Sequence, residues 1–374
     1  MESIASAPGK TILFGEHSVV YDEPAIAAAI NKRATVKIKP SKNNKTILKS
    51  DDLGFKAELN TKQKKYTLIK GKPGIIRYIL EALSKVHDHQ PIEINLSTNI
   101  PIGLGLGSSA AVTVATLASL YRYHQIKFTK KSLANDAHEV ELSVQGAASP
   151  LDTLVCTYGG FVYLSRNKKI DIFKNNFNSS FVLAYTSKYG STGKMVKGVK
   201  LLKDKQPVVM DSIVKTMGLL ADEAKKAILD NDVNKIGELM NINHGLLDSI
   251  GVSTIELSRM VYLARNNGAI GSKITGAGGG GSILSLCPGK TQKVETALNK
   301  QFNAIPVKFS KKGISSKVNN NENPKKGIKI NKANVNKSKK PNNISNSGNV
   351  LKNQKRIYGK KISNSISAKK DYSN

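Results

Sequence analysis

The sequence predicts an α+β protein made of two lobes, with a functional site in the cleft between them and a disordered basic tail. The chain has 374 residues, of which 39% are hydrophobic, so it can fill a large core but is too long for one compact unit. Strand patterns dominate its opening, and long helical periods dominate its later part. Residues 310–374 have no sustained apolar period. These three observations predict two folded lobes followed by a tail.

We expect the first lobe to span residues 1–165. Its strands are short apolar or alternating runs, at residues 11–14, 25–30, 34–38, 92–96 and 161–164. Its helices have apolar residues at helical spacing or are rich in alanine, valine and leucine, at residues 74–86, 110–123 and 131–145. The fourth strand leads into a glycine-rich run, so that run joins a strand to a helix.

We expect the second lobe to span residues 166–309 and to be mainly helical at first. Its pattern is helical between residues 208 and 265, with interruptions that divide it into several antiparallel helices. A second glycine-rich turn over 273–282 then precedes a strand over 283–286. A helix over 294–302 and an edge strand over 304–309 complete the lobe.

The first glycine-rich run carries the clearest functional signal. Residues 101–111 read Pro-Ile-Gly-Leu-Gly-Leu-Gly-Ser-Ser-Ala-Ala and stand just before a helix. Glycines let backbone N–H groups approach a ligand, and the helix N-terminus adds unpaired donors and the positive end of its dipole. The run therefore predicts a cradle for a polyphosphate. Taken alone, it could also be only a tight connection between a strand and a helix.

Two familiar phosphate motifs do not account for this chain. A Walker A loop is excluded, because the only Gly-Lys-Thr, at residues 9–11, has Ile4 where an earlier glycine is required. Residues 105–110 fit a loose dinucleotide fingerprint, but no acidic residue stands between Glu93 and Asp136 to hold a ribose. The Rossmann interpretation is therefore weak.

Cysteine content and hydropathy indicate the compartment. Cys156 and Cys287 are the only cysteines and stand far apart, so we expect neither a disulfide framework nor a cysteine-rich metal site. The sequence has no apolar run long enough to span a membrane and no leader at its N-terminus. We therefore expect a cytoplasmic protein that does not contact a membrane.

The net charge of +31 is divided unevenly along the chain. Residues 310–374 hold 17 Lys and Arg against Glu322 and Asp371, so about half of the excess charge lies in this asparagine- and serine-rich segment. Such a composition predicts disorder. The segment could contact nucleic acid, but without interleaved aromatic residues a solvated tail is the favoured interpretation.

Three segments together resemble the three motifs of the GHMP kinase superfamily. They lie at residues 6–21, 101–111 and 273–281. Further segments are similar to the branch of the superfamily that phosphorylates mevalonate, at residues 145–152, 158–160, 243–247 and 251–253. The resemblance covers residues 3 to about 309. The chain departs from it at Asp22, where glycine is common, at Gly190, where longer relatives have a basic residue, and at Ser282, where cysteine is frequent.

This resemblance implies transfer of the γ-phosphoryl group of ATP to the 5-hydroxyl of mevalonate, with Mg²⁺ as cofactor, in isoprenoid biosynthesis. It also implies a homodimer. One alternative is a related kinase that acts on phosphomevalonate or another alcohol. A second is a non-catalytic protein of the same fold that binds nucleic acid through its tail. Intact motif residues argue against the second alternative.

The resemblance also assigns roles to individual residues. Asp152 would accept the proton of the substrate hydroxyl, with Lys10 as its cationic partner. The Ser109 hydroxyl and the Glu141 carboxylate would hold Mg²⁺, with Ser108 as the alternative to Ser109 if the match is off by one residue. Nine residues would surround the ATP phosphates: Pro101, Ile102, Gly103, Leu104, Gly105, Leu106, Gly107, Ser108 and Ser109. Three would contact the substrate: Glu16, His17 and Thr192. Five would form a glycine loop that closes over the site: Gly276, Ala277, Gly278, Gly279 and Gly280.

Overall fold

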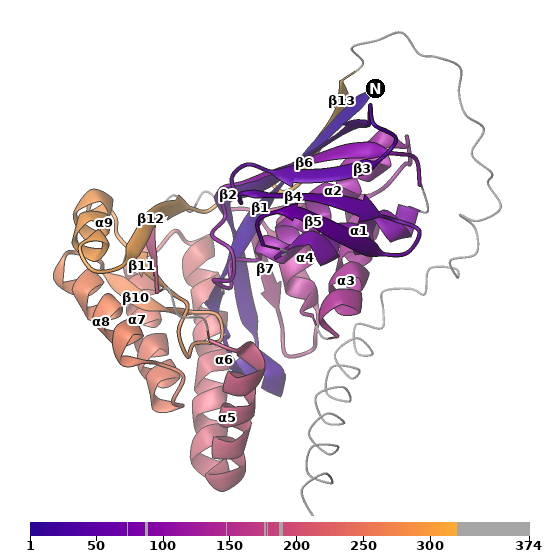
Figure 1. Cartoon of the computed structure of the whole chain (residues 1–374). Coiled ribbons are helices and arrows are strands. Elements are labelled where there is room, and N and C mark those ends of the chain that lie inside the picture. The colour runs from indigo at the N-terminus through magenta and orange to yellow at the C-terminus, as the bar shows by residue number, and fades with distance from the viewer. Residues whose placement is uncertain are drawn as a thin grey trace, which may run out of the picture.

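The protein consists of two lobes that lie side by side, as the computed structural model in Figure 1 shows. The structure describes residues 1–72, 74–86, 89–146, 148–175, 177, 179–186 and 190–319. Both lobes combine a β-sheet with helices, so the predicted α+β, two-lobe class is confirmed. No helix in these ranges is long and apolar enough to cross a membrane.

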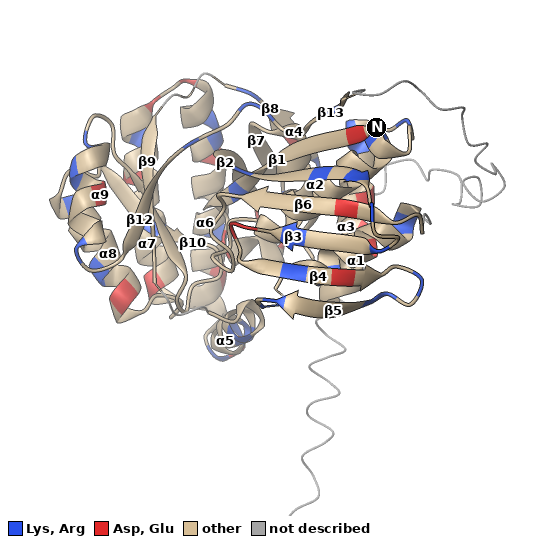
Figure 2. Ribbon diagram, turned by 45° about the horizontal axis from the view of Figure 1, so that its top comes forward, with Lys and Arg blue, Asp and Glu red and all other residues tan. Residues whose placement is uncertain are grey.

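The first lobe is built on a nine-stranded sheet whose main path has the order β13-β1-β2-β6-β3-β4-β5, with β7 beside β2 and β8 beside β7. Its strands are β1 (Glu2–Phe14), β2 (Ala25–Pro40), β3 (Thr46–Ser50), β4 (Phe55–Asn60), β5 (Lys65–Lys70), β6 (Ile92–Thr98), β7 (Phe161–Leu164), β8 (Ile170–Phe173) and β13 (Ser315–Asn319). Its helices are α1 (Ile76–Val86), α2 (Ser108–Tyr123), α3 (Lys130–Gln145) and α4 (Pro150–Tyr158). In Figure 1 and Figure 2 these helices gather behind the sheet.

Helix α2 lies directly against β1 and β2 and is buried on nearly all sides. Alanine, serine and threonine fill much of it, and this explains its close approach to the sheet, because small side chains leave little space between the two backbones. The glycine-rich run that precedes α2 is thereby held at one end of the sheet.

The second lobe has a four-stranded antiparallel sheet in the order β10-β11-β9-β12. Its strands are β9 (Ser180–Tyr185), β10 (Gly271–Thr275), β11 (Ser282–Leu286) and β12 (Asn303–Lys308). Its helices are α5 (Thr192–Lys205), α6 (Pro207–Leu229), α7 (Val233–Ser249), α8 (Ile255–Asn266) and α9 (Thr291–Asn299). The several helices expected between residues 208 and 265 are confirmed as α6, α7 and α8.

Both lobe boundaries differ from those expected. Residues 166–173 belong to the first lobe, because β8 forms a hairpin with β7. The tail was expected to begin at residue 310, but Glu2 to Ser6 of β1 pair with residues of β13. The chain therefore returns from the second lobe to the edge of the first sheet. The remainder of the expected tail, 320–374, lies outside the described residues.

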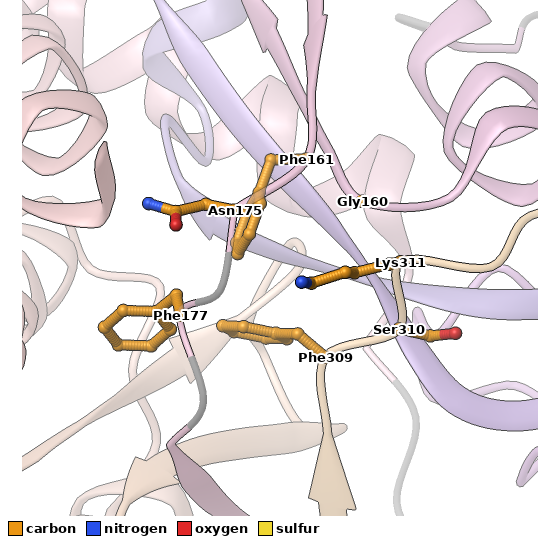
Figure 3. A pocket seen from close by; sticks show the side chains of 7 residues that line it. All are labelled: Gly160, Phe161, Asn175, Phe177, Phe309, Ser310 and Lys311. Carbon is orange, nitrogen blue, oxygen red and sulfur yellow. The ribbon is translucent and has the colours of Figure 1, made fainter. Parts of the chain in front are cut away.

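The two lobes share one hydrophobic cluster rather than meeting across a wet interface. Where the chain returns to the first lobe, the ring of Phe309 lies 5.2 Å from that of Phe161 in β7 and 4.4 Å from that of Phe181 in β9. Phe161, Phe177 and Phe309 line a cavity of about 380 Å³. In Figure 3 the amino group of Lys311 points toward the space between Phe161 and Phe309. The rings join the two sheets beside an isolated bridge between Phe309 and Ile30 of β2.

A buried ion pair also crosses between the lobes. The Nζ atom of Lys273 in β10 contacts the Oε1 atom of Glu16, which follows β1, and both side chains are at most 1% exposed. Asn243 of α7 donates to the other oxygen of Glu16 at 3.2 Å, and the Ile274 carbonyl accepts from Lys273 at 2.6 Å. Burial lowers the pKa of Lys273, whereas the charge of Glu16 opposes that shift. Every polar contact of the pair thus lies inside the protein.

Removal of one partner of this pair should destabilise the fold strongly. Lys273→Met would leave the Glu16 carboxylate buried without a cation, so we expect the free energy of unfolding to fall by about 3–5 kcal/mol. Lys45→Met is the matched control, because Lys45 pairs with Glu58 on the surface, where such pairs contribute about 0–1 kcal/mol. Urea denaturation measures both changes. Equal losses in the two variants would show that burial of the Glu16–Lys273 pair is irrelevant to stability.

Candidate active site

The run between β6 and α2 forms a turn in which glycines and leucines alternate in exposure. Gly103 and Gly105 are exposed, whereas Leu104 and Leu106 are buried. Gly103, Gly105 and Gly107 have φ values of 81°, 74° and 65°, which a residue with a side chain rarely adopts. Leu104 and Leu106 pack into the core, Gly103 and Gly105 face outward, and Gly107 is buried at the start of α2.

The amides of this turn are available to a ligand. Within the described part of the chain, no backbone N–H from residues 103 to 110 donates to a protein acceptor. Two carbonyls of the turn face inward instead: Leu106 O accepts from the Lys10 amide at 2.9 Å, and Leu104 O accepts from the Ser282 hydroxyl at 2.9 Å. Free donors at a helix N-terminus fit an anion, so this arrangement has the geometry of the predicted cradle.

Lys10 and Asp152 meet beside the cradle. The Nζ atom of Lys10 in β1 lies 3.0 Å from Oδ1 of Asp152, in the first turn of α4. The helix begins there because Ser149 caps it, accepting from the Leu151 amide at 3.3 Å. A Cβ atom on Gly107 would stand 2.7 Å from Lys10 Cγ, so glycine also gives the lysine side chain room to reach Asp152.

Ser109 and Glu141 form a second polar pair next to the first. Ser109 in α2 donates from its hydroxyl to Oε1 of Glu141 in α3 at 2.7 Å. Burial and then the nearby charge of Asp152 raise the pKa of Glu141, whereas the hydrogen bond from Ser109 and the charge of Lys10 lower it, and the net result is a pKa of about 7. The site therefore holds two carboxylates of different character around one lysine.

These oxygen donors fit Mg²⁺. Its usual protein ligands are one or two carboxylates, with waters and substrate phosphates completing the shell. The buried Glu141 carboxyl and the Ser109 hydroxyl provide suitable oxygen atoms at the edge of the cradle. The described residues contain no group of three or more His, Cys, Asp or Glu side chains that could hold a metal ion without phosphates.

The residues expected to contact the substrate lie in different environments. Glu16 is engaged with Lys273 and Asn243. His17, at φ 61°, hydrogen-bonds through Nε2 to the Ala277 carbonyl at 2.8 Å, and burial lowers its pKa. The neutral imidazole must then carry its proton on Nε2, because a carbonyl can only accept. Thr192 is exposed at the first position of α5. Their contacts with substrate stay predictions.

The second glycine-rich turn, between β10 and β11, faces the first. If Gly105 carried a Cβ atom, the nearest atom would be the Cα of Gly276, at 4.0 Å. A Cβ on Gly278 would stand 2.2 Å from the Val252 carbonyl, and one on Gly279 would stand 2.4 Å from Sδ of Met195 in α5. Glycine is therefore required here by close packing as well as by positive φ. The two turns bring both lobes to one site.

Sequence reasoning assigned no role to Lys273, Asn243 or Ser282, although all three fasten the site. Lys273 did carry a signal: it is the one charged residue in a strand of five buried positions. A buried ammonium group requires a carboxylate partner, so such a lysine predicts a long-range ion pair. For Asn243 and Ser282 the sequence has no comparable signal, because buried amides and hydroxyls find partners of many kinds. The two cysteines are both buried and free.

Family models match both lobes. The GHMP kinases N terminal domain matches residues 72–160, and the GHMP kinases C terminal domain matches residues 224–304. The mevalonate kinase of Methanothermobacter thermautotrophicus is 46% identical over 314 residues, which cover 84% of this chain and all of that protein. The mevalonate kinase of Pyrococcus horikoshii is 40% identical over 326 residues, which cover 83% of this chain and 96% of that protein.

Solved structures agree with the sequence relatives. The Methanococcus jannaschii mevalonate kinase superposes with a TM-score of 0.72 at 31% identity, covering 82% of this chain and 98% of its own. The L. major mevalonate kinase in complex with R-mevalonate gives 0.71 at 25% identity, covering 81% and 94%. The chain therefore belongs to the mevalonate kinase family of the GHMP kinases and is an ATP-dependent phosphotransferase.

Proposed function

We propose that this enzyme transfers the γ-phosphoryl group of ATP to the 5-hydroxyl of (R)-mevalonate, giving 5-phosphomevalonate and ADP. The observation that carries the proposal is the Lys10–Asp152 pair, 3.0 Å apart, beside a turn of unengaged amides. A phosphoryl donor and an alcohol acceptor need these two features next to each other. Mevalonate is taken as the acceptor because the relatives at up to 46% identity are mevalonate kinases.

The chain's own residues would divide the reaction as follows. The amides of residues 103–110 bind the ATP phosphates and neutralise part of their charge. Asp152 orients the hydroxyl and accepts its proton as the oxygen attacks the γ-phosphorus. The bond from that phosphorus to the bridging oxygen breaks, and ADP leaves. Lys10 stabilises the charge that develops on the transferring group. Ser109 and Glu141 would hold Mg²⁺, which shields the phosphate oxygens when bound.

The glycine turn over 276–280 and the residues around it would hold mevalonate opposite the phosphates. His17 supports the turn through Ala277, and Thr192 begins the helix that packs against it through Met195. Glu16 would act on the substrate from within its buried contacts with Lys273 and Asn243. We also infer a homodimer in the cytoplasm, a compartment that suits two buried free thiols. A nucleic-acid contact through the tail is not favoured.

The decisive experiment measures ADP release by the purified protein with Mg²⁺-ATP and each of several acceptors. Release with mevalonate, and none with mevalonate phosphates, galactose or homoserine, would support the proposal. Release with another acceptor would retain the kinase but replace the substrate. No release with any acceptor would refute the proposed activity.

Loss of the Asp152 carboxylate should affect chemistry more than binding. Asp152→Asn keeps the shape of the side chain but cannot accept the proton, so we expect kcat to fall by about 10²- to 10⁴-fold while nucleotide affinity stays nearly constant. Asp171→Asn is a suitable control, because its carboxylate pairs with Lys225 on the surface. Steady-state kinetics and direct nucleotide binding separate the two effects. An equal loss of nucleotide binding in Asp152→Asn would indicate a disrupted site.

The raised pKa of Glu141 predicts a pH-dependent cost in the enzyme free of Mg²⁺. The folded state binds the Glu141 proton more strongly than the unfolded chain does, because the pKa rises from 4.5 to about 7 on folding. Stability should therefore fall as the pH rises through that window, and the cost is complete above it. Glu141→Gln removes the charge, so it should stabilise the protein by up to about 3 kcal/mol near pH 8.

The same stabilisation should vanish near about pH 4, where both side chains are neutral. Urea denaturation at the two pH values, without divalent cations, measures the difference. A gain of equal size at both values would show that the charge of Glu141 is not its cause. With Mg²⁺ and nucleotide bound, the parent protein should recover most of the difference, because the cation offsets the buried charge.

A further inference from the structure

A hydroxyl of the second lobe binds the glycine-rich turn of the first lobe. We call this turn, over residues 103–110, the phosphate turn. Ser282 begins β11, immediately after the glycine turn, and donates from Oγ to the Leu104 carbonyl at 2.9 Å. Ser282 is 0% exposed and Leu104 is 4% exposed, so water does not compete for this bond. The two residues are 178 positions apart, and the contact joins the two glycine-rich turns directly.

We propose that Ser282 is a positioning residue for ATP, which sets the direction of an amide in the phosphate cradle without touching the nucleotide. This inference rests on the proposed binding of ATP phosphates by residues 103–110. In a trans peptide, the C=O of one residue and the N–H of the next point in opposite directions. Because Ser282 draws the Leu104 carbonyl toward β11, the Gly105 amide is turned away from the protein body, toward the open side of the turn.

The cradle has a second anchor of the same kind. The Lys10 amide binds the Leu106 carbonyl at 2.9 Å, which by the same geometry directs the Gly107 amide. One anchor therefore comes from β1 in the first lobe and the other from β11 in the second. The Gly105 and Gly107 amides of the cradle are therefore oriented by two different lobes.

Gly105 makes the anchor from Ser282 necessary. A flip of the peptide between Leu104 and Gly105 changes the φ of Gly105, and glycine adopts either sign of φ at little cost. After such a flip a carbonyl oxygen, rather than an N–H, would face the phosphates. The glycine that lets the backbone approach the ligand thus also permits the wrong orientation, and the bond from Ser282 selects the right one.

Ser282 is rigidly held, as an anchor must be. Its strand lies inside the sheet, between β10 and β9, with Ser282 opposite Thr275 on one side and Tyr185 on the other. Thr275 donates from Oγ1 to the Ile12 carbonyl of β1 at 2.9 Å. Of these two paired residues, Thr275 therefore binds β1 through its hydroxyl, and Ser282 binds the phosphate turn through its own.

The same strand offers a matched control. Ser285 in β11 is also 0% exposed, and its hydroxyl bonds to that of Ser272 at 2.8 Å, entirely within the second lobe. Ser285→Ala removes a buried hydroxyl and a hydrogen bond just as Ser282→Ala does, but it leaves the phosphate turn untouched. Any difference between the two variants then reports the contact with Leu104.

The test compares Ser282→Ala, Ser282→Cys and Ser285→Ala in the full chain. We expect Ser282→Ala to raise the KM for ATP, and the Kd of a fluorescent ADP analogue measured without mevalonate, by about tenfold. The KM for mevalonate at saturating ATP should not change, and the thermal midpoint should equal that of Ser285→Ala. Ser282→Cys keeps a weaker donor and should give an intermediate nucleotide affinity.

Equal nucleotide affinity in Ser282→Ala and Ser285→Ala would overturn the inference. So would a parallel loss of affinity for both substrates in Ser282→Ala, because a general distortion would then explain the result. If Ser282→Ala does not fold, Ser282→Cys with parental nucleotide affinity would overturn the inference, and a selective loss would support it. The binding measurement needs no phosphoryl acceptor, so failure of the proposed function and failure of this inference are distinguishable.

Discussion

The buried ion pair between Glu16 and Lys273 is the constraint on which the arrangement of the site depends. Two opposite charges that are cut off from water tolerate little displacement, because each loses its compensation when the other moves. The pair thereby fixes the end of β1 against β10. That position brings His17 to the Ala277 carbonyl and Thr275 to the Ile12 carbonyl. The glycine turn between β10 and β11 is left facing the phosphate turn.

A buried ion pair is an expensive way to gain stability, since desolvation of two charges offsets much of their attraction. The contribution of the pair is to fix the relative position of the two lobes. The shared hydrophobic cluster would hold the lobes together in many slightly different positions, because apolar contacts are not directional. An ion pair with fixed hydrogen bonds from Asn243 and to Ile274 permits one position only. Phosphoryl transfer needs such accuracy, because misplaced reactants lose most of the benefit of proximity.

The sequence predicted the local segments of the site much better than the long-range contacts that hold them in place. Residues 101–111 predict a phosphate turn from local chemistry alone, since glycine periodicity and a following helix are visible within one segment. The pairing of Lys10 with Asp152 came only from family resemblance, because no local pattern joins residues 142 positions apart. The anchors of Ser282 and Asn243 have no sequence signal, because a buried hydroxyl or amide becomes specific only through the partner that the fold provides.

For the fold, the sequence likewise predicted the long helices but missed several strands. Helices α6, α7 and α8 follow long apolar periods and were expected, whereas β3, β4 and β5 were not, since lysines interrupt them and β5 is largely exposed. Strand β13 was missed for a related reason. Its residues are polar, and it is a strand because β1 leaves an edge free for it. Tertiary pairing, rather than local preference, determines such edge strands.

The electrostatics of the site follow from its place between the lobes. Lys10 lies near two carboxylates, but only Asp152 forms an ion pair with it, and Glu141 is left in a buried position without a cation of its own. A carboxyl in that state retains its proton up to about neutral pH, so the site without Mg²⁺ would carry less negative charge than its residues suggest. Arrival of Mg²⁺ with the nucleotide would release that proton and charge the carboxylate. The site would then acquire its full negative charge only when the cation that balances it is bound, which reconciles the buried Glu141 and the partly exposed Asp152 with the proposed polyphosphate cradle.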